Sequence, residues 1–219
     1  MEQISTICGM CNNLACGLQI ETDGRTLLQV SGDKNSLVNK GLICPQARAV
    51  LELQHSDERL KNPLKKSKAG WLSISWDQAL DEIAAKFSAI CRQHGGQSIA
   101  LYQGHAVLSL IRQGWSQRFL SLIRSPNMVR NDHICHMPTK MVERCTYGHG
   151  LFGNFDPQKV DCLVLWGVDP STSSVSVMWP RVKSALRNGA KLVVIDPIQN
   201  RSSDKATLHL APRPGSDGA

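Results

Sequence analysis

The chain has 219 residues, of which 42% are hydrophobic and 20% charged, and its formal net charge is +7. A chain of this size and composition buries a core and forms one or two domains, which excludes a disordered protein and a simple fibre. The positive charge suits anionic ligands, but the basic residues are spread along the chain, with their densest group at Lys61 to Lys68, so we expect no nucleic-acid partner.

Membrane and export signals are not evident in the sequence. No apolar run reaches the roughly 18 to 20 residues that a membrane helix needs. The first residues lack a basic region followed by an apolar one, and no twin arginines follow Met1. We therefore expect a soluble cytoplasmic protein that does not insert directly into a membrane.

The first part of the chain, from Cys8 to about Pro63, is rich in turns. Gln19–Glu21 and Leu27–Val30 are predicted strands, and Asp23-Gly24 between them predicts a β-hairpin. A lobe this small has little hydrophobic core and needs a crosslink, such as a bound metal, to be stable. The lysine-rich stretch Lys61–Gly70 is typical of a linker.

The rest of the chain alternates helices with strands. Ser75-Trp76-Asp77-Gln78 has the form of a capping box, and apolar residues follow at helical spacing until Gly95-Gly96. The further predicted elements are a buried strand at Ser98–Tyr102, helices at Val107–Ile123 and Met137–Tyr147, a strand at Asp161–Trp166, a helix at Val175–Asn188 closed by Gly189, and a strand at Lys191–Ile195. This alternation predicts a parallel sheet with helices on its faces.

Eight cysteines occur, at positions 8, 11, 16, 44, 91, 135, 145 and 162. Disulfide frameworks are typical of small exported domains, and the chain has no export signal, so metal ligation by the first four is the better interpretation. We expect Cys91, on the apolar face of the first long helix, to lie in the core. Cys145 and Cys162 are also expected to be core residues.

The first four cysteines are spaced as three plus one. Cys8, Cys11 and Cys16 lie close together, and Cys44 follows at a distance with Pro45 directly after it. Structural zinc sites usually come as two separated pairs. Three thiolates from one loop and a remote fourth before proline are typical of a cuboidal iron–sulfur cluster, in which each iron takes one cysteine. We predict a [4Fe-4S] cluster, with a zinc ion or unliganded thiols as the alternatives.

Further motifs follow these cysteines in the order of a known family. They are Arg48, Leu60-Lys61-Asn62-Pro63-Leu64, Ile74-Ser75-Trp76-Asp77-Gln78-Ala79-Leu80, Leu165-Trp166-Gly167-Val168-Asp169-Pro170, Val194-Ile195-Asp196-Pro197 and Arg213-Pro214-Gly215-Ser216-Asp217. The chain thereby resembles the molybdopterin oxidoreductase family, the dimethyl sulfoxide reductase superfamily that includes formate dehydrogenases and nitrate reductases. The resemblance implies an α/β fold, with a small N-terminal β-rich [4Fe-4S] lobe at residues 1–62. An incomplete Rossmann-like parallel-sheet domain that binds the molybdopterin dinucleotide follows at residues 63–219.

The resemblance also implies a molybdenum or tungsten ion held by two molybdopterin guanine dinucleotides, with the cluster passing electrons to or from it. In this family one protein side chain usually completes the shell of the metal. In formate dehydrogenases that residue is followed by His, any residue and Pro, which Cys135-His136-Met137-Pro138 matches. Cys135 is therefore the candidate metal ligand and His136 the candidate proton carrier. A buried apolar cysteine and a structural histidine are the alternative interpretations.

Dinucleotides bind at the carboxyl ends of parallel strands, where loops and helix N-termini supply donors. The segment after the Asp161–Trp166 strand and the carboxylate that ends the next strand suit phosphate, ribose or guanine, and the Pro-Gly-Ser-Asp segment resembles the guanine-binding segment of the family. The candidate contacts are Gly167, Asp169, Pro170, Ser171, Asp196, Gly215 and Asp217. Ordinary turns with surface carboxylates are the alternative. The chain has no Gly-x-Gly-x-x-Gly fingerprint for a nicotinamide cofactor.

Three features depart from the family pattern. Four residues instead of three separate Cys11 from Cys16. Gln46 stands where the family often has Lys or Arg between cluster and pterin; it can hydrogen-bond a pterin but brings no charge. The chain also stops inside the Arg213–Asp217 motif, so we expect it to be a fragment of a longer enzyme.

Two-electron redox chemistry on a small-molecule substrate is the expected function, and Cys135-His136 favours a formate-dehydrogenase-like reaction. Electrons would pass through the cluster to an iron–sulfur partner subunit. The alternatives are a truncated, non-catalytic electron-transfer module, a hydratase-type member in which the metal acts as a Lewis acid, and a zinc-stabilised nucleic-acid-binding module.

Overall fold

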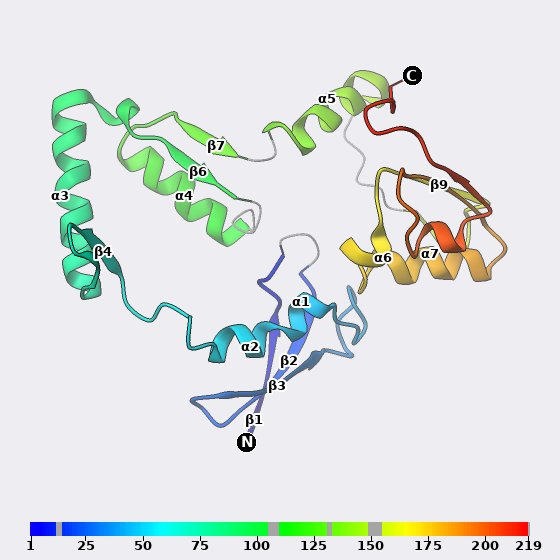
Figure 1. Cartoon of the computed structure of the whole chain (residues 1–219), viewed down its shortest axis with the longest axis horizontal. Coiled ribbons are helices and arrows are strands. Elements are labelled where there is room, and N and C mark those ends of the chain that lie inside the picture. The colour runs from blue at the N-terminus through cyan, green and yellow to red at the C-terminus, as the bar shows by residue number, and fades with distance from the viewer. Residues whose placement is uncertain (12–14, 105–109, 131–132, 149–154, 219) are drawn as a thin grey trace. The chain divides into compact units, whose positions relative to one another are not determined.

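Alternating side chains and a tight turn build the N-terminal sheet. In the computed structural model, which describes residues 1–11, 15–104, 110–130, 133–148 and 155–218, β1 (Glu2–Ile7), β2 (Gly17–Thr22) and β3 (Leu27–Gly32) form an antiparallel sheet in that order (Figure 1). The hairpin predicted at Asp23-Gly24 is confirmed: Asp23 Oδ1 accepts hydrogen bonds from the backbone N–H groups of Arg25 and Thr26, at 2.8 and 2.7 Å. β1 is an exposed edge strand that the sequence analysis did not assign.

The chain divides into two compact units. The first contains Met1–Leu51 and Leu151–Ala219, and the second contains Glu52–Gly150. In the first unit the N-terminal sheet is followed by α1 (Pro45–Arg48) and the start of α2 (Val50–His55).

The stretch expected to be a linker, Lys61–Gly70, instead contributes to a hairpin at the start of the second unit. β4 (Leu64–Ser67) pairs antiparallel with β5 (Gly70–Ser73). Gly70 takes a φ of +119°, and Ser67 Oγ donates to the Gly70 carbonyl oxygen at 2.9 Å. The linker prediction was wrong, because it rested on the lysine content and the lysines of this strand contact other side chains. Lys65 Nζ lies 2.7 Å from Glu82 Oε2. Lys66 Nζ lies 5.9 Å from the centre of the Trp71 ring.

The long helix predicted after Ser75 is confirmed as α3 (Trp76–His94). Ser75 Oγ accepts a hydrogen bond from the Gln78 N–H at 3.1 Å, whereas the Gln78 side chain donates to Glu82 at 3.1 Å. The helix therefore has one half of a capping box, because Gln78 does not reach back to Ser75.

The remaining elements of the second unit include a parallel strand pair. The short helix η1 (Gly96–Ser98) precedes β6 (Leu101–Gln103), which pairs parallel with β7 (Met128–Arg130). In the chain, α4 (Leu110–Leu122) lies between these two strands, and α5 (His136–Tyr147) follows β7. The strand lies later than predicted at Ser98–Tyr102, because the residues after Gly95 form a short 3₁₀ turn. Residues 107–109 of the predicted helix lie outside the described residues.

The second sheet of the first unit carries most of its core. β8 (Cys162–Trp166), β9 (Lys191–Ile195) and β10 (Leu208–Leu210) are parallel, in the order β10-β9-β8. α7 (Met178–Arg187) lies between β8 and β9 in the chain, preceded by α6 (Pro170–Ser173), and η4 (Ser203–Lys205) precedes β10. Its buried cluster consists of Leu163, Leu165, Trp179, Val182, Ala185, Ala190, Leu192 and Val194.

The single helix predicted at Val175–Asn188 is shorter than expected. Ser174 Oγ accepts a hydrogen bond from the Met178 N–H at 3.1 Å, which starts α7 after a turn, and Gly189 ends it with a φ of +95°. The predicted α/β class, a small β-rich lobe with a parallel-sheet domain, is confirmed.

Three cysteines expected in the core lie elsewhere. Cys145 and Cys162 are exposed, and Cys91 is half-buried. In β8 the alternation buries Leu163 and Leu165 on one face and leaves Cys162 on the other, so the strand period decides its exposure.

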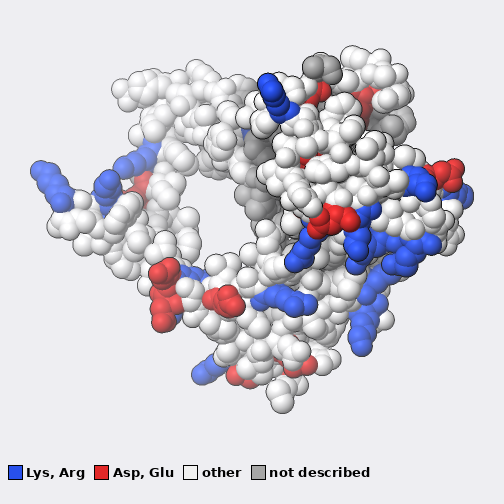
Figure 2. Space-filling model, turned by 45° about the vertical axis from the view of Figure 1, so that its right-hand side comes forward, with Lys and Arg blue, Asp and Glu red and all other residues white. Residues whose placement is uncertain are grey.

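Charged side chains of both signs are interspersed over the face shown in Figure 2. Among the described residues, no helix is long and apolar enough to cross a membrane.

Candidate metal centre and cofactor-binding residues

The β1–β2 connection carries three of the four predicted cluster ligands. Cys8 follows β1 and Cys16 precedes β2, and the Cys8 N–H donates to the Cys16 carbonyl oxygen at 2.8 Å. Cys11 lies between them, and residues 12–14 lie outside the described part of the chain. The sheet thus closes the base of a loop whose three thiols are half-buried.

Cys44 is the N-cap residue of α1, and Pro45 occupies the first helical position. A buried asparagine connects this segment to the cysteine loop. Asn39, 1% exposed, accepts from the Gly17 N–H at 2.8 Å and donates to the carbonyl oxygens of Gly17 and Leu42, at 3.0 and 2.7 Å. Its amide thus joins the residue after Cys16 to a residue two before Cys44.

Sequence reasoning missed Asn39, because an asparagine in a turn-rich segment has no spacing signal. Gly17 shows how close the two segments come. A Cβ added at Gly17 would lie 2.7 Å from the Cβ of Ser36, so a larger residue next to Cys16 would displace the segment that leads to Cys44.

The other three cysteines influence the Cys16 thiol electrostatically. Burial raises the pKa of the Cys16 thiol, a hydrogen bond with Ser176 acts against this, and Cys11, Cys8 and Cys44 each raise the pKa further. All four cysteines are free of disulfides. The structure therefore brings together the four residues that the spacing singled out.

These residues fit an iron–sulfur cluster. Among the described residues, no three His, Cys, Asp or Glu side chains converge closely enough to hold a single metal ion. A [4Fe-4S] cluster takes one cysteine for each iron, so its ligands surround a larger volume than those of one ion. Four soft thiols are the donor set that such a cluster takes.

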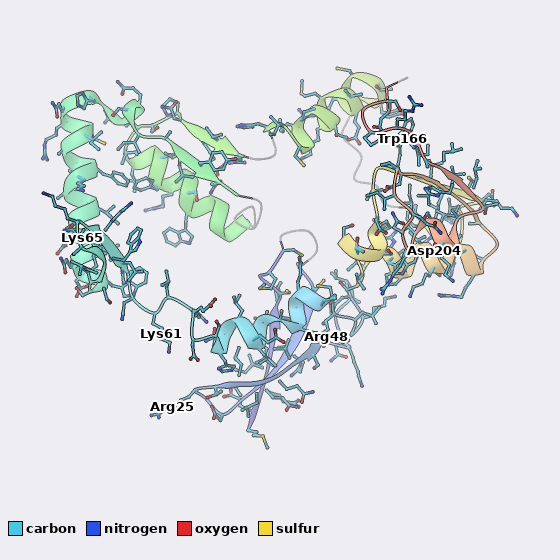
Figure 3. The ribbon with its side chains drawn as sticks, in the orientation of Figure 1. Arg25, Arg48, Lys61, Lys65, Trp166 and Asp204 are labelled. Carbon is cyan, nitrogen blue, oxygen red and sulfur yellow. The ribbon has the colours of Figure 1, made fainter. Side chains whose placement is uncertain are left out.

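Gln46 and Arg48 lie on α1, and both are exposed; Figure 3 labels Arg48. Ala47 between them is buried. Gln46 thus follows Cys44 closely on an exposed part of the helix and is available to a polar ligand.

The β8–α6 connection holds four of the predicted dinucleotide contacts. Gly167 follows β8 with a φ of +60°, a conformation that favours glycine. Asp169 is the N-cap of α6 and accepts a hydrogen bond from the Ser171 N–H at 3.0 Å, while Pro170 at the next position is buried. The connection is therefore a rigid turn at the carboxyl end of a parallel strand.

Asp169 is the centre of a hydrogen-bond network. Its carboxylate accepts hydrogen bonds from Thr172 Oγ1, at 2.9 Å, and from the hydroxyl of Ser202, a fully buried residue after β9. Burial acts to raise the pKa of the Asp169 carboxyl, but Ser171, Ser202 and Thr172 together hold it below its ordinary value. Ser202 was missed by sequence reasoning, because its role depends on contact with a residue on another strand connection.

The Ser171 side chain fits a site that receives a polar ligand. Ser171 is 2% exposed; its hydroxyl acts to lower the pKa of Asp169, but its Oγ makes no hydrogen bond of normal geometry in the described part of the chain. A buried hydroxyl without a partner is unfavourable unless another polar group reaches it.

Asp196 follows β9 at the same edge of the sheet as Gly167, because parallel strands end together and Gly167 N–H donates to the Ile195 carbonyl oxygen at 2.9 Å. Its Oδ1 accepts from the Ile198 N–H at 2.9 Å, so part of its carboxylate stabilises the following turn. Gly215 and Asp217 are exposed near a turn in which the Ser216 N–H donates to the Arg213 carbonyl oxygen at 3.0 Å.

The predicted metal ligand Cys135 and its neighbour His136 belong to the second unit. Cys135 is exposed and is the N-cap residue of α5, where its side chain makes no capping hydrogen bond. His136 is the first residue of that helix. The Cys135 thiol is accessible to solvent.

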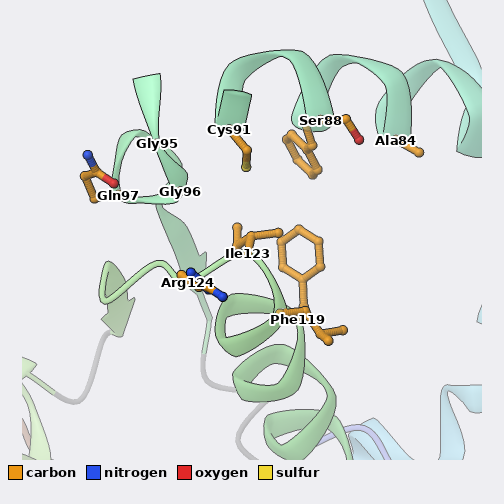
Figure 4. A pocket seen from close by; sticks show the side chains of 11 residues that line it. Ala84, Ser88, Cys91, Gly95, Gly96, Gln97, Phe119, Ile123 and Arg124 are labelled. Atoms are coloured by element: carbon orange, nitrogen blue, oxygen red, sulfur yellow. The ribbon is translucent and has the colours of Figure 1, made fainter. Parts of the chain in front are cut away.

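The second unit also contains an open groove between α3 and α4, with a volume of 640 Å³ (Figure 4). Cys91, Phe119 and Ile123 contribute to its lining, and the Phe87 and Phe119 rings lie 5.6 Å apart. None of the predicted site residues lines it.

Two family models match the chain. Residues 1–56 match the molybdopterin oxidoreductase Fe4S4 domain, and residues 59–219 match molybdopterin oxidoreductase. Both cofactor classes expected from the sequence, a [4Fe-4S] cluster and a molybdenum- or tungsten-bound molybdopterin, are those of these domains.

Curated relatives and a solved structure agree with this match. Acetylene hydratase of Syntrophotalea acetylenica is 30% identical, over 97% of this chain and 30% of its own length. The F420-dependent formate dehydrogenase 2 subunit alpha of Methanococcus maripaludis is 27% identical, over 98% of this chain and 31% of its own. A nitrate reductase of Symbiobacterium thermophilum is 27% identical, over 97% of this chain and 28% of its own.

The structure of acetylene hydratase from Pelobacter acetylenicus superposes with a TM-score of 0.76 at 27% identity, covering 95% of this chain and 29% of that one. The chain thus spans about 30% of the length of these relatives. It belongs to the molybdopterin oxidoreductase family and carries the Fe4S4 domain of that family at its N-terminus.

Proposed function

We propose that this chain is the N-terminal part of a molybdopterin-dependent oxidoreductase that carries out two-electron chemistry on a small substrate. The single observation that carries the proposal is the grouping of four free cysteines, stapled by Asn39, in a lobe whose sequence matches the Fe4S4 domain. We place the division between the cluster lobe and the dinucleotide domain at residues 62 and 63.

In this proposal Cys8, Cys11, Cys16 and Cys44 hold the [4Fe-4S] cluster. Burial of the thiols limits solvent access, and the Cys8–Cys16 backbone hydrogen bond fixes the ends of the loop. When bound, the cluster supplies one-electron transfer between the active-site metal and a partner. A separate iron–sulfur subunit is the partner we propose, and the cytoplasm is the proposed location.

The remaining site residues bind the bis-dinucleotide cofactor and its metal. Gly167, Asp169, Pro170, Ser171 and Asp196 lie at the carboxyl edge of one parallel sheet, where they would hold phosphate and ribose. Gly215 and Asp217 would contact guanine, and Gln46 the pterin. Cys135 would complete the shell of the molybdenum or tungsten, a centre that supplies two-electron chemistry when bound, and His136 would take up or deliver the accompanying proton.

Formate-dehydrogenase-like chemistry is our first choice of reaction. The Cys135-His136-Met137-Pro138 segment supports it, as do two relatives named formate dehydrogenase alpha subunits at 27% and 28% identity. A hydratase-type reaction without net electron transfer is the second candidate, favoured by the 30% identity to acetylene hydratase and by the structural match.

Metal content and turnover test the proposal. We expect the longer protein that contains this sequence, made in a pterin-producing host, to hold iron, sulfide and molybdenum or tungsten, and to reduce a viologen dye with formate. Iron and sulfide without molybdenum or tungsten would favour the electron-transfer module, and zinc in place of iron would refute the cluster. Consumption of acetylene without reduction of the dye would support the hydratase-type reaction over the formate-dehydrogenase-like one.

A variant tests the metal ligand separately. Cys135→Ala in the longer protein should keep its iron and lose turnover, whereas Cys145→Ala, also an exposed cysteine on α5, should keep both. Full activity of Cys135→Ala would show that another residue completes the metal shell.

A further inference from the structure

A serine far along the chain reaches one of the cluster cysteines. Ser176 Oγ lies 3.5 Å from Cys16 Sγ, although the two residues are 160 positions apart. Ser176 is 6% exposed, and the Cys16 sulfur is the hydrogen-bond partner of its hydroxyl within the described part of the chain. A buried hydroxyl requires such a partner.

The position of this hydroxyl is fixed by the turn that carries it. Ser176 lies between α6 and α7, where the Ser174 carbonyl oxygen accepts from the Trp179 N–H at 3.0 Å and Ser174 Oγ accepts from the Met178 N–H at 3.1 Å. Trp179 belongs to the buried core of the sheet domain. The hydroxyl is therefore held by the same framework that positions Asp169.

Cluster ligation sets the direction of the hydrogen bond. A cysteine bound to iron is a thiolate and has no proton to donate, so its sulfur can only accept. The serine hydroxyl then donates. Hydrogen bonds to charged acceptors strengthen as negative charge increases, and a reduced cluster carries one more electron on its iron and sulfur atoms than an oxidised one.

We propose that Ser176 donates a hydrogen bond to the Cys16 thiolate of the bound cluster and thereby raises the reduction potential of the cluster. The inference rests on the proposed cluster site. Ser176 is a positioning and tuning residue, since it acts through Cys16. In the redox step one electron enters the cluster from a donor, no bond is broken, and the hydroxyl proton stays on Ser176.

The test is a potentiometric titration of the chain, reconstituted without oxygen from iron and sulfide and reduced stepwise with dithionite. In Ser176→Ala we expect full iron and sulfide content and an equilibrium constant for cluster reduction that falls about tenfold, a shift of about 59 mV to lower potential for a one-electron couple. Ser176→Thr keeps the hydroxyl and should restore most of the potential.

Ser203→Ala is the matched control. Ser203 is a buried serine of the same unit, and its hydroxyl donates to the Asn200 carbonyl oxygen at 2.8 Å. Its loss should lower stability without moving the potential, which separates a general effect of removing a buried hydroxyl from a specific effect on the cluster.

Three results would overturn the proposal. An unchanged potential in iron-loaded Ser176→Ala contradicts the tuning role alone. Loss of the cluster in Ser176→Ala but not in Ser176→Thr would mean that the hydroxyl holds the loop instead of setting the potential. Absence of iron from the reconstituted unmodified chain contradicts the cluster site itself, and the tuning role with it.

Discussion

At the scale of single residues, three buried polar side chains organise the site. Asn39, Ser176 and Ser202 each join segments that are distant in sequence, and each is less than a tenth exposed. Buried polar groups contribute when their partners are present and cost free energy when one is removed. Substitutions at these residues are therefore sharper tests of the site than substitutions of its exposed residues.

Asn39→Ala should weaken the cluster lobe. It removes three hydrogen bonds and takes the side-chain acceptor away from the N–H of the buried Gly17, whose carbonyl oxygen still accepts from the Asp33 N–H, so we expect the free energy of unfolding to fall by about 2 kcal/mol. Urea unfolding measures the change, and the iron content of the reconstituted chain should fall with it. Asn35→Ala, at an exposed position of the same segment, is the control; equal effects of both substitutions would contradict the stapling role.

The Asp169 network predicts a dependence of stability on pH. The pKa of this carboxyl is lowered in the folded chain, so the stability it contributes is fully present above its ordinary pKa of 3.8 and is lost as the pH falls through the lower pKa of the folded state. Ser202→Ala removes one donor, so the pKa of Asp169 should move back up and the loss on acidification should become smaller.

Urea unfolding between about pH 3 and pH 7 measures this dependence. Ser203→Ala lacks two neutral hydrogen bonds, one donated by its hydroxyl to the Asn200 carbonyl oxygen and one accepted from the Asn200 N–H, and should lower stability by the same amount at every pH. A Ser202→Ala profile parallel to that of the unmodified chain would show that Ser202 does not act on the carboxylate.

At the scale of elements, local signals account for helix starts and strand faces. The Ser75 cap begins α3, the Asp23 turn closes the β2–β3 hairpin, and the alternation in β8 places Leu163 and Leu165 in the core. The exposed face of β8, with Cys162, is a consequence of the same alternation. A parallel sheet is usually covered on both faces, and the exposure of Cys162 departs from that rule.

The half-formed capping box of α3 gives an element-level prediction. Ser75→Ala should cost about 1 kcal/mol, because the Gln78 N–H loses its acceptor, and Ser75→Asp should be close to the unmodified chain. Gln78→Ala should cost only about 0.2 to 0.5 kcal/mol, since its side chain bonds Glu82 four residues later. Thermal or urea unfolding provides both values, and equal costs at the two positions would indicate a complete box.

At the scale of the whole molecule, the N-terminal lobe depends on its metal. Its sheet contributes few residues to the buried core, which lies chiefly around β8, β9 and α7. A lobe of this kind obtains much of its folding free energy from metal binding, as small metal-binding domains generally do.

Cys44→Ala tests this dependence. We expect this variant to lose the cluster and its lobe to unfold at a lower urea concentration than in the iron-loaded unmodified chain. The unmodified chain from which a chelator has removed the iron should behave in the same way. Cys162→Ala is the control, because this exposed cysteine belongs to the same compact unit but is not among the four proposed ligands. Unchanged iron content and unfolding in Cys44→Ala would exclude Cys44 as a ligand.

The sequence by itself determined the family, both cofactor classes, the α/β class, the four longest helices and half of the strands that the structure describes. These features depend on spacing, turn residues and periodicity, which are local properties of the chain. The lysines of β4 show the limit of composition, because a lysine-rich stretch was predicted to be a linker although Lys65 and Lys66 lie in a paired strand and contact Glu82 and Trp71.

Only the tertiary structure decided which polar side chains join the segments of the site. Asn39 links two cysteine-bearing segments, Ser202 reaches Asp169 from 33 residues away, and Ser176 reaches Cys16 from 160 residues away. A hydrogen bond needs its atoms within about 3.5 Å, and such approaches depend on how strands and connections pack. Serine and asparagine are common in turns, so their roles here follow from contact in space and not from their neighbours in the chain.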